Sequence, residues 1–229
     1  MTVPFPPLTL EAVVLDHDGT LVDSEPVHLR IWQSVLAEHG AELSALEYSE
    51  RLSGIPTIES ARYLVASRGL TLSAEALCQR KLSEVSQYLT RAAFPLMTGA
   101  LELLEDLRGR GLAVAVASGA GRAEVTHSLA IHRLEPFISS VVTGSDVSAN
   151  KPAPDVYLRA LRELGSDGAR ALAVEDSDTG EASARSAGLF CLRLDTPSRL
   201  PREAGTLRVP DLRAVRQWIG GLAEGTYFR

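Results

Sequence analysis

Short apolar runs alternate with stretches of helical spacing along most of the sequence, and this alternation limits the folds open to the chain more than any other feature. The runs are rich in valine, alanine and leucine: Ala12–Leu15, Leu112–Ala117, Ser140–Val142, Ala171–Val174 and Phe190–Leu194. A last helix is expected over 211–222, after a polar loop over 196–206. Continuous apolar runs of this length are typical of parallel strands covered by helices on both faces. We therefore predict an α/β fold with a Rossmann-like, doubly wound parallel sheet and right-handed crossovers.

The interval between the first apolar run and the second is far longer than one crossover needs. It has helical spacing over three stretches, 25–39, 57–67 and 73–90. Ser24 is the expected N-cap of the first stretch. The pattern predicts a helical cap domain over 23–91, inserted into a core domain made of 1–22 and 92–229. An insertion at this place is expected to act as a lid, the alternative being a helical excursion that only packs on the core.

The composition limits the kinds of molecule that the chain is expected to bind. The chain has 229 residues, 45% hydrophobic and 23% charged, and a net charge of −6. It has no basic excess to neutralise nucleic-acid phosphates, and no stretch approaches the length of a membrane span, so neither partner is expected. The N-terminal MTVPFPPLTL lacks the features of a signal peptide, and Cys78 and Cys191 form no disulfide framework. We expect a monomer in the reducing cytoplasm.

Polar side chains follow the predicted strands at the point where each strand ends. In chain order they are Asp16 and Asp18, then Ser118 and Gly119, then Lys151, then Glu175 and Asp176. Ligands of an open parallel sheet bind outside the carboxyl ends of the strands. Carboxylates, a hydroxyl and a lysine gathered there suit phosphoryl transfer, which depends on positioning and charge neutralisation. Mg²⁺ is the expected cofactor, because it prefers oxygen ligands such as the carboxylates of Asp16 and Asp176.

Each of these groups can be given a role in phosphoryl transfer. Asp16 can attack phosphorus and form an aspartyl phosphate. Asp18 can protonate the leaving oxygen and then activate water, provided that neighbouring charge raises its pKa. Ser118 and the amides beside Gly119 can bind a phosphoryl oxygen, and Lys151 can neutralise the phosphate as a point charge.

The same residues resemble the motifs of a known family. They are Asp16-His17-Asp18-Gly19-Thr20-Leu21, Ser118, Lys151-Pro152 and Glu175-Asp176-Ser177-Asp178-Thr179-Gly180. In order and spacing they are similar to the haloacid dehalogenase superfamily, in the subfamily whose helical cap follows the first motif. The resemblance implies that Asp16 is the nucleophile and Asp18 the acid/base, with Gly19 and Thr20 beside the substrate. Dehalogenases of this superfamily lack an aspartate two residues after the nucleophile, so the presence of Asp18 argues against dehalogenase activity.

The resemblance also implies a metal site. In it Mg²⁺ would be held by the carboxylates of Asp16 and Asp176 and by the backbone carbonyl of Asp18. Glu175 would lie near the metal through water or orient the ligands. The substrate implied is a small-molecule phosphate monoester.

The predicted cap is similar to that of β-phosphoglucomutase and small sugar-phosphate phosphatases. His28 matches the entry into that cap, and Lys81 matches its basic residue. Both are expected to contact substrate, the alternative for Lys81 being a solvated helix face. Thr57 stands where the mutase carries an arginine that grips a second phosphate. We therefore expect a phosphatase for a small phosphorylated metabolite such as a sugar phosphate, with a phosphomutase or a phosphoglycolate phosphatase as alternatives.

Other interpretations stay open at this point. The stretch from Ser118 to Glu124 is similar to a dinucleotide-binding loop, but Glu124 stands at the third glycine position and the loop does not follow the first strand. A receiver-like signalling domain or a partner-binding protein without catalysis are further alternatives, and the Asp pair could be a strand-capping turn. His17 is expected to point away from Asp16 and Asp18, because side chains alternate along an extended segment.

Overall fold

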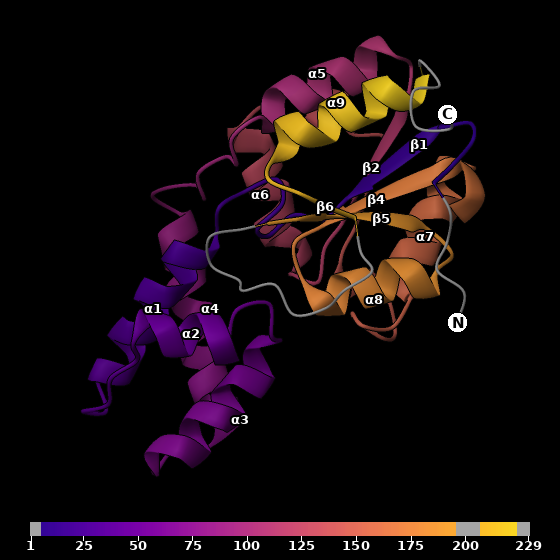
Figure 1. The fold of residues 1–229 in the computed structure, drawn as a ribbon. Helices are drawn as coiled ribbons and strands as arrows, with labels where there is room; N and C mark the ends of the chain where they lie inside the picture. Colours follow the sequence, from indigo (N-terminus) through magenta and orange to yellow (C-terminus); the bar gives the residue numbers. More distant parts are fainter. Residues whose placement is uncertain (1–5, 196–206, 224–229) are drawn as a thin grey trace.

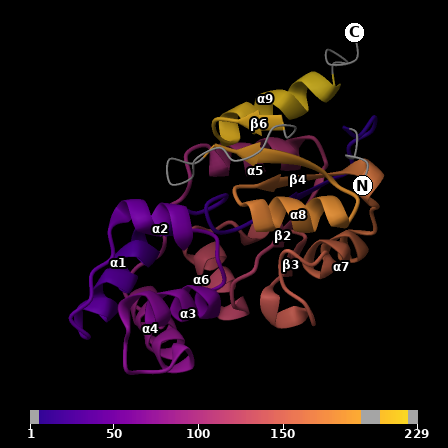
Figure 2. The same ribbon diagram turned by 60° about the horizontal axis from the view of Figure 1, so that its bottom comes forward.

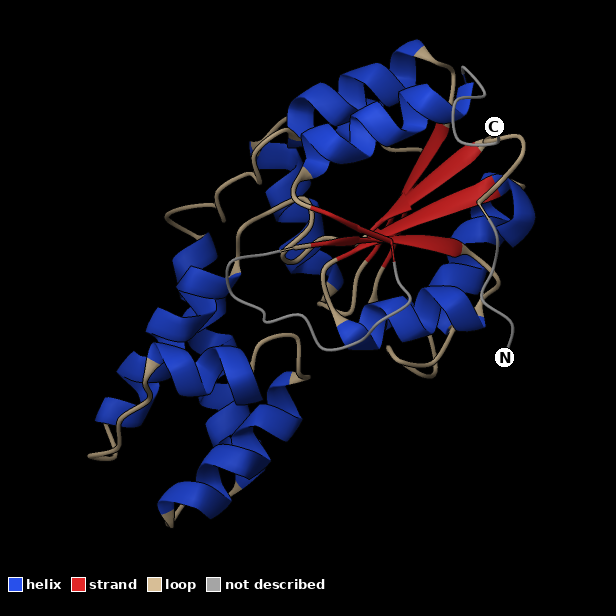
Figure 3. Ribbon diagram, in the orientation of Figure 1, coloured by secondary structure: helices blue, strands red, loops and turns tan. Residues whose placement is uncertain are grey.

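The computed structural model describes residues 6–195 and 207–223, and a six-stranded parallel sheet lies at its centre (Figures 1 and 3). The strand order is β3-β2-β1-β4-β5-β6. The strands are β1 Ala12–Leu15, β2 Ala113–Ala117, β3 Ser140–Val142, β4 Ala171–Glu175, β5 Phe190–Leu194 and β6 Leu207–Val209. The five predicted strands and the doubly wound α/β fold are confirmed. The short edge strand β6 was not predicted.

Helices cover both faces of the sheet because alternate strand residues point to opposite faces. One face packs on α5 (Ala100–Gly109), α6 (Arg122–Ile131) and α9 (Leu212–Ala223). The other face packs on α7 (Asp155–Leu164) and α8 (Asp178–Ser186). Within β1, Val13 and Leu15 belong to the first layer and Val14 to the second. The first strand is therefore buried on both sides, and the chain that leaves it emerges at the carboxyl edge of the sheet.

Four helices that do not cover the sheet lie between β1 and α5. They are α1 Glu25–Ala37, α2 Ala45–Arg51, α3 Thr57–Arg68 and α4 Ala74–Leu89, and α2 was not predicted. Figures 1 and 2 show them together beside the core rather than on a face of the sheet. They bury a hydrophobic cluster of their own, which includes Trp32, Leu36, Leu64 and Leu77. This separate cluster supports the division into a core and an inserted domain, which stays a prediction.

Serine side chains cap the N-termini of two of these helices, as is typical of helix N-caps. The side chains of Ser44 and Ser73 accept hydrogen bonds from the amides of Glu47 and Ala76. Ser24 is the N-cap residue of α1, as expected, but it has a helical backbone conformation and makes no side-chain capping hydrogen bond.

Two expectations concern the chain as a whole. Among the helices of residues 6–195 and 207–223, none is long and apolar enough to cross a membrane. The expected polar loop over 196–206, and the first half of the N-terminal segment, lie outside the described residues.

A hydrogen-bond network around Asp146 holds the turn after β3. The backbone amide and hydroxyl of Thr143 donate to Oδ2 of Asp146 at 2.8 and 2.7 Å. Arg122 donates to its two oxygens through Nε at 3.1 Å and Nη2 at 2.6 Å. Burial alone would raise the pKa of Asp146, but these hydrogen bonds outweigh it and hold the pKa at about 2. The network ties the first turn of α6 to the loop that leads to Lys151.

Asp146→Asn is expected to lower the free energy of unfolding by about 1 kcal/mol at pH 7, because it weakens charge-assisted hydrogen bonds that are partly open to solvent. The folded pKa lies below the unfolded value of roughly 3.9, so this stabilisation is present above that value and is lost as pH falls through the folded pKa. Urea unfolding of both proteins between neutral pH and about pH 2 measures it. A difference that stays constant over this range would contradict the account, and the exposed Glu105→Gln is the control.

Candidate active site

Three carboxylates meet at the carboxyl edge of the sheet. Asp16 follows the last residue of β1, Glu175 ends β4, and Asp176 follows it. The two strands are neighbours in register, with Leu15 opposite Val174. All three side chains are buried, and one carboxylate oxygen from each lies within 4.8 Å of those from the other two. The predicted clustering of Asp16 with Asp176 therefore follows from strand pairing.

Lys151 lies among these carboxylates, on the loop after β3. Its Nζ donates to Asp16 Oδ1 and to Glu175 Oε1, both at 2.6 Å, and to the carbonyl oxygen of Ala117 at 2.8 Å. Burial alone would lower the pKa of Lys151, but the two carboxylates outweigh it and raise the pKa. The lysine is therefore a fixed positive charge that joins the ends of β1, β2 and β4.

Glu175 has hydrogen-bond donors at both oxygens. The Tyr157 hydroxyl donates to Oε1 at 2.8 Å, beside the Lys151 bond. At Oε2 the donors are the Ser177 hydroxyl at 3.1 Å and the amide of Asp176 at 3.2 Å. A Cβ at Gly180 would lie 2.0 Å from this carboxylate, so the glycine allows α8 to approach it. These contacts suit Glu175 to orienting its neighbours, and Tyr157 is a member of the site that the sequence reasoning missed.

The cluster of Asp16, Glu175, Asp176 and Lys151 carries more negative than positive charge. Burial and the Glu175 carboxylate raise the pKa of Asp16 to about 7, although Lys151 acts in the opposite direction. A divalent cation between Asp16 and Asp176 would offset that charge, and carboxylate oxygens are the ligands that Mg²⁺ prefers. The donor set therefore fits the metal expected from the sequence.

Asp18 lies on the turn that follows β1, where His17 from the same turn and His28 from α1 lie near it. His17 Nδ1 is 3.1 Å from Asp18 Oδ2, so the expectation that His17 points away from Asp18 was wrong. Alternation fails because the strand ends at Leu15 and the chain turns, with the amides of Leu21 and Val22 donating to the His17 carbonyl.

The electrostatics at Asp18 also differ from expectation. Burial tends to raise its pKa, but the charges of His17 and His28 and the hydrogen bond from His17 outweigh it. The pKa of Asp18 is therefore lowered, whereas a raised pKa was expected. His28 Nε2 lies 4.0 Å from Asp18 Oδ1, and burial, aided by Lys81, lowers the pKa of His28 to about 3.

Three small residues of the motifs lie behind the site rather than at its surface. Gly19 has φ +80° and its Cα faces the Asp176 carboxylate, while Thr20 is fully buried outside the cavity wall. Ser118 is also fully buried; its hydroxyl donates to Asp18 Oδ2 at 3.5 Å and accepts from the amide of Ala120 at 3.0 Å. Gly119, by contrast, lines the cavity. The placement supports substrate contact for Gly119 and supporting roles for the other three.

A cavity of about 390 Å³ opens above the carboxylates, between the core and the four inserted helices. From the core it is lined by Asp16, Asp18, Gly119, Glu124, Lys151 and Asp176, and from the helices by Glu25, His28, Trp32, Tyr48, Thr57 and Lys81, among others. Lys81 is 5% exposed and its Nζ donates to Thr57 Oγ1 at 3.5 Å, so it does not lie on a solvated face. Arg80 pairs with Glu38 and Glu84 instead.

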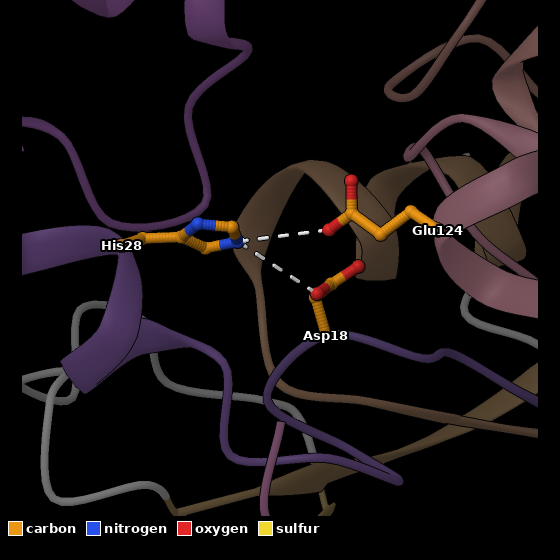
Figure 4. Close-up of side chains that lie close together, drawn as sticks. All are labelled: Asp18, His28 and Glu124. Carbon is orange, nitrogen blue, oxygen red and sulfur yellow. Dashed lines mark ion pairs between the residues drawn. The ribbon is translucent and has the colours of Figure 1, made fainter. Parts of the chain in front are cut away.

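Glu124 is the cavity residue whose role the sequence did not suggest. It lies in the first turn of α6, and its Oε1 is 3.9 Å from His28 Nε2. Figure 4 shows the His28 ring pointing between Asp18 and Glu124. Burial and the Asp18 carboxylate raise the pKa of Glu124 to about 7, against the charge of Lys81. The sequence does contain one sign of this placement, because Glu124 lies in the first turn of the helix that follows β2.

Comparison with known proteins agrees with this geometry. The family model for haloacid dehalogenase-like hydrolases matches residues 13–194. The chain belongs to this family. It is similar to CbbY of Rhodobacter capsulatus, at 33% identity over 91% of this chain and 96% of the relative. It is also similar to the fructose-1-phosphate phosphatase YqaB of Escherichia coli, at 29% identity over 77% of this chain and 92% of the relative.

Solved structures show the same fold. CbbY from Rhodobacter sphaeroides, in complex with phosphate, superposes with a TM-score of 0.75 at 28% identity, over 89% of this chain and 95% of that one. A family hydrolase from Deinococcus radiodurans, with bound phosphate and sodium, gives 0.77 at 26% identity over 94% and 97%. The family and its phosphatases identify this chain as a phosphoric monoester hydrolase. The dinucleotide-binding and the receiver-like interpretation of the sequence are not compatible with membership of this family.

Gly19→Ala is expected to reduce turnover of p-nitrophenyl phosphate by about a hundredfold, because small misplacements in a catalytic site have effects of that order. The new methyl group would lie 2.1 Å from Asp176 Oδ2, and the residue has a positive φ. Gly109→Ala is the matched control, since a Cβ there meets nothing within 4 Å. Steady-state kinetics measure both variants. Wild-type turnover in Gly19→Ala would show that the position of Asp176 is unimportant.

Proposed function

We propose that this protein is a Mg²⁺-dependent phosphatase that hydrolyses a small phosphate monoester, such as a sugar phosphate, through an aspartyl phosphate on Asp16. The observation that carries this proposal is the meeting of Asp16, Asp18, Lys151 and Asp176 on the floor of one cavity. Two carboxylates with different surroundings can serve as nucleophile and acid/base, as phosphoryl transfer requires. We expect the enzyme to act as a monomer in the cytoplasm.

The metal would be held by the carboxylates of Asp16 and Asp176 and the backbone carbonyl of Asp18, with Glu175 orienting these ligands. When bound, Mg²⁺ would neutralise part of the charge on the phosphate and on the carboxylates. Lys151 supplies further positive charge beside Asp16, to which it is hydrogen-bonded at 2.6 Å. Together these charges would let a phosphate dianion approach a carboxylate nucleophile.

The reaction proceeds in two steps. A carboxylate oxygen of Asp16 attacks phosphorus, and the bond from phosphorus to the leaving oxygen breaks. Asp18 gives its proton to that oxygen, so the alcohol leaves neutral. Asp18 then takes a proton from water, whose oxygen attacks phosphorus and releases phosphate from Asp16. Lys151 holds one oxygen of Asp16, which leaves the other to attack.

Substrate binding favours the protonated form of Asp18 that the first step needs. His17 favours the carboxylate form of Asp18 in the free protein, through its charge and its hydrogen bond. A phosphate dianion beside Asp18 adds negative charge and so raises the pKa of this carboxyl. The acid form would therefore be favoured when substrate is bound, and the base form after the alcohol has left.

The cavity wall favours a phosphatase over a mutase. A mutase has to hold a bisphosphate by both ends, which bidentate arginine contacts serve best. No arginine of the described chain lines the cavity, and Thr57 is at the place of the expected clamp. Lys81 is the one observation in favour of a phosphomutase, because a buried ammonium could hold a second phosphate. Nothing on the wall singles out the carboxylate of phosphoglycolate.

Phosphate release from small phosphate esters tests the proposal. The set contains fructose 1-phosphate, erythrose 4-phosphate, glycerol phosphates, phosphoglycolate and nucleoside monophosphates, each with Mg²⁺ and with chelator. We expect Mg²⁺-dependent release from a few sugar phosphates and none with chelator. Conversion of β-glucose 1-phosphate to the 6-phosphate without release would establish the mutase instead.

Asp16→Asn is the matched control for this assay. The amide is nearly isosteric with the carboxylate but is a poor nucleophile, so release should fall to background while thermal unfolding shows a folded protein. Activity retained in this variant would refute Asp16 as the nucleophile.

A further inference from the structure

The Glu124 side chain faces the cavity without a hydrogen bond. Among the residues that the structure describes, its one close polar contact is His28 Nε2 at 3.9 Å, which is beyond hydrogen-bond distance. The side chain of Glu124 is only 16% exposed. A largely buried carboxylate is normally hydrogen-bonded, because its desolvation is otherwise uncompensated. A group that enters the cavity can supply the missing donor.

Lys81 projects toward the same part of the cavity from the inserted helices. Its charge acts on the pKa of Glu124, yet within residues 6–195 and 207–223 no ion pair or hydrogen bond joins the two side chains. Lys81 hydrogen-bonds to Thr57 instead, at 3.5 Å. One donor and one acceptor of opposite charge thus flank a gap. A neutral group with several hydroxyls can hydrogen-bond to both sides of such a gap without adding charge.

A second anionic group on the substrate would fit this gap poorly. Lys81 would attract it, but Glu124 would repel it in a partly buried site, and Glu25 also lines the cavity. An amine would be repelled by Lys81 in turn. The charge pattern therefore favours a neutral, hydroxyl-rich leaving group over a carboxylate, a phosphate or an amine.

We propose that Glu124 is a specificity-determining residue that accepts hydrogen bonds from hydroxyl groups of the leaving alcohol, opposite Lys81, and disfavours substrates with a second anionic group. This inference rests on the proposed phosphatase function and deepens it. Glu124 touches the leaving group and not the transferred phosphoryl group, so it acts on the choice of substrate.

The test compares selectivity within each enzyme. The kcat/KM values for fructose 1-phosphate and for phosphoglycolate are measured with wild type, Glu124→Gln and Glu124→Asp, and the ratio of the two values is formed. We expect the ratio to fall about tenfold or more in Glu124→Gln, with a higher KM for fructose 1-phosphate and a lower KM for phosphoglycolate. Forming a ratio cancels any effect that both substrates share.

Glu124→Asp separates hydrogen bonding from charge. It keeps the negative charge but withdraws it by one methylene, so KM for fructose 1-phosphate should rise while discrimination against phosphoglycolate persists. Glu105→Gln is the matched control, because it removes an exposed carboxylate from α5, which contributes no residue to the cavity wall and lies apart from α1 to α4 (Figure 1). Its ratio should equal that of wild type.

The outcomes separate the two proposals. An unchanged ratio in Glu124→Gln, with Mg²⁺-dependent hydrolysis intact in wild type, would overturn the role of Glu124 and leave the phosphatase standing. No hydrolysis of any phosphate ester by wild type would overturn both. A Glu124→Gln variant whose loss is greatest for an amine-bearing sugar phosphate would show that the carboxylate pairs with a cation instead.

Discussion

The ammonium of Lys151 holds the active site together. It joins Asp16, Glu175 and the end of β2 through three hydrogen bonds of 2.6 to 2.8 Å. Without it, three buried carboxylates would repel one another at the end of β1 and β4, and the carboxyl edge of the sheet would be a place of uncompensated charge. Tyr157 and the amides of the turn at Asp176 complete the hydrogen bonding of Glu175. The remaining negative charge, at Asp16 and Asp176, is what suits this place to a divalent cation.

The floor of the cavity and the wall opposite it differ in charge and so have different proposed roles. The floor combines Asp16 with Lys151 and suits a phosphoryl group, whose charge is met by fixed cations. The opposite wall offers Lys81 and Glu124, whose charges are opposite. On the proposals made above, the strand ends of the core carry out the chemistry, and the wall that the inserted helices share with α6 selects the substrate.

Much of the fold could be predicted from the sequence, because its patterns have a local physical cause. Parallel strands buried on both faces appear as continuous apolar runs, so β1 to β5 and the strand-end residues were predictable. The short strand β6 was not, because Arg208 interrupts its three residues and leaves no continuous apolar run. His17 was misplaced because alternation holds only while the strand lasts. The lowered pKa of Asp18 and the place of Glu124 depend on side chains from three separate segments, which no single motif contains.

The most direct test of the account is to trap the covalent enzyme. Wild type is mixed with fructose 1-phosphate and Mg²⁺, quenched in acid within milliseconds, digested, and analysed by mass spectrometry. The account predicts a phosphoryl group on the peptide that contains Asp16, at a level that falls when substrate is exhausted. Rapid phosphate release with no phosphorylated Asp16 at any time would contradict it, because water would then attack the substrate directly.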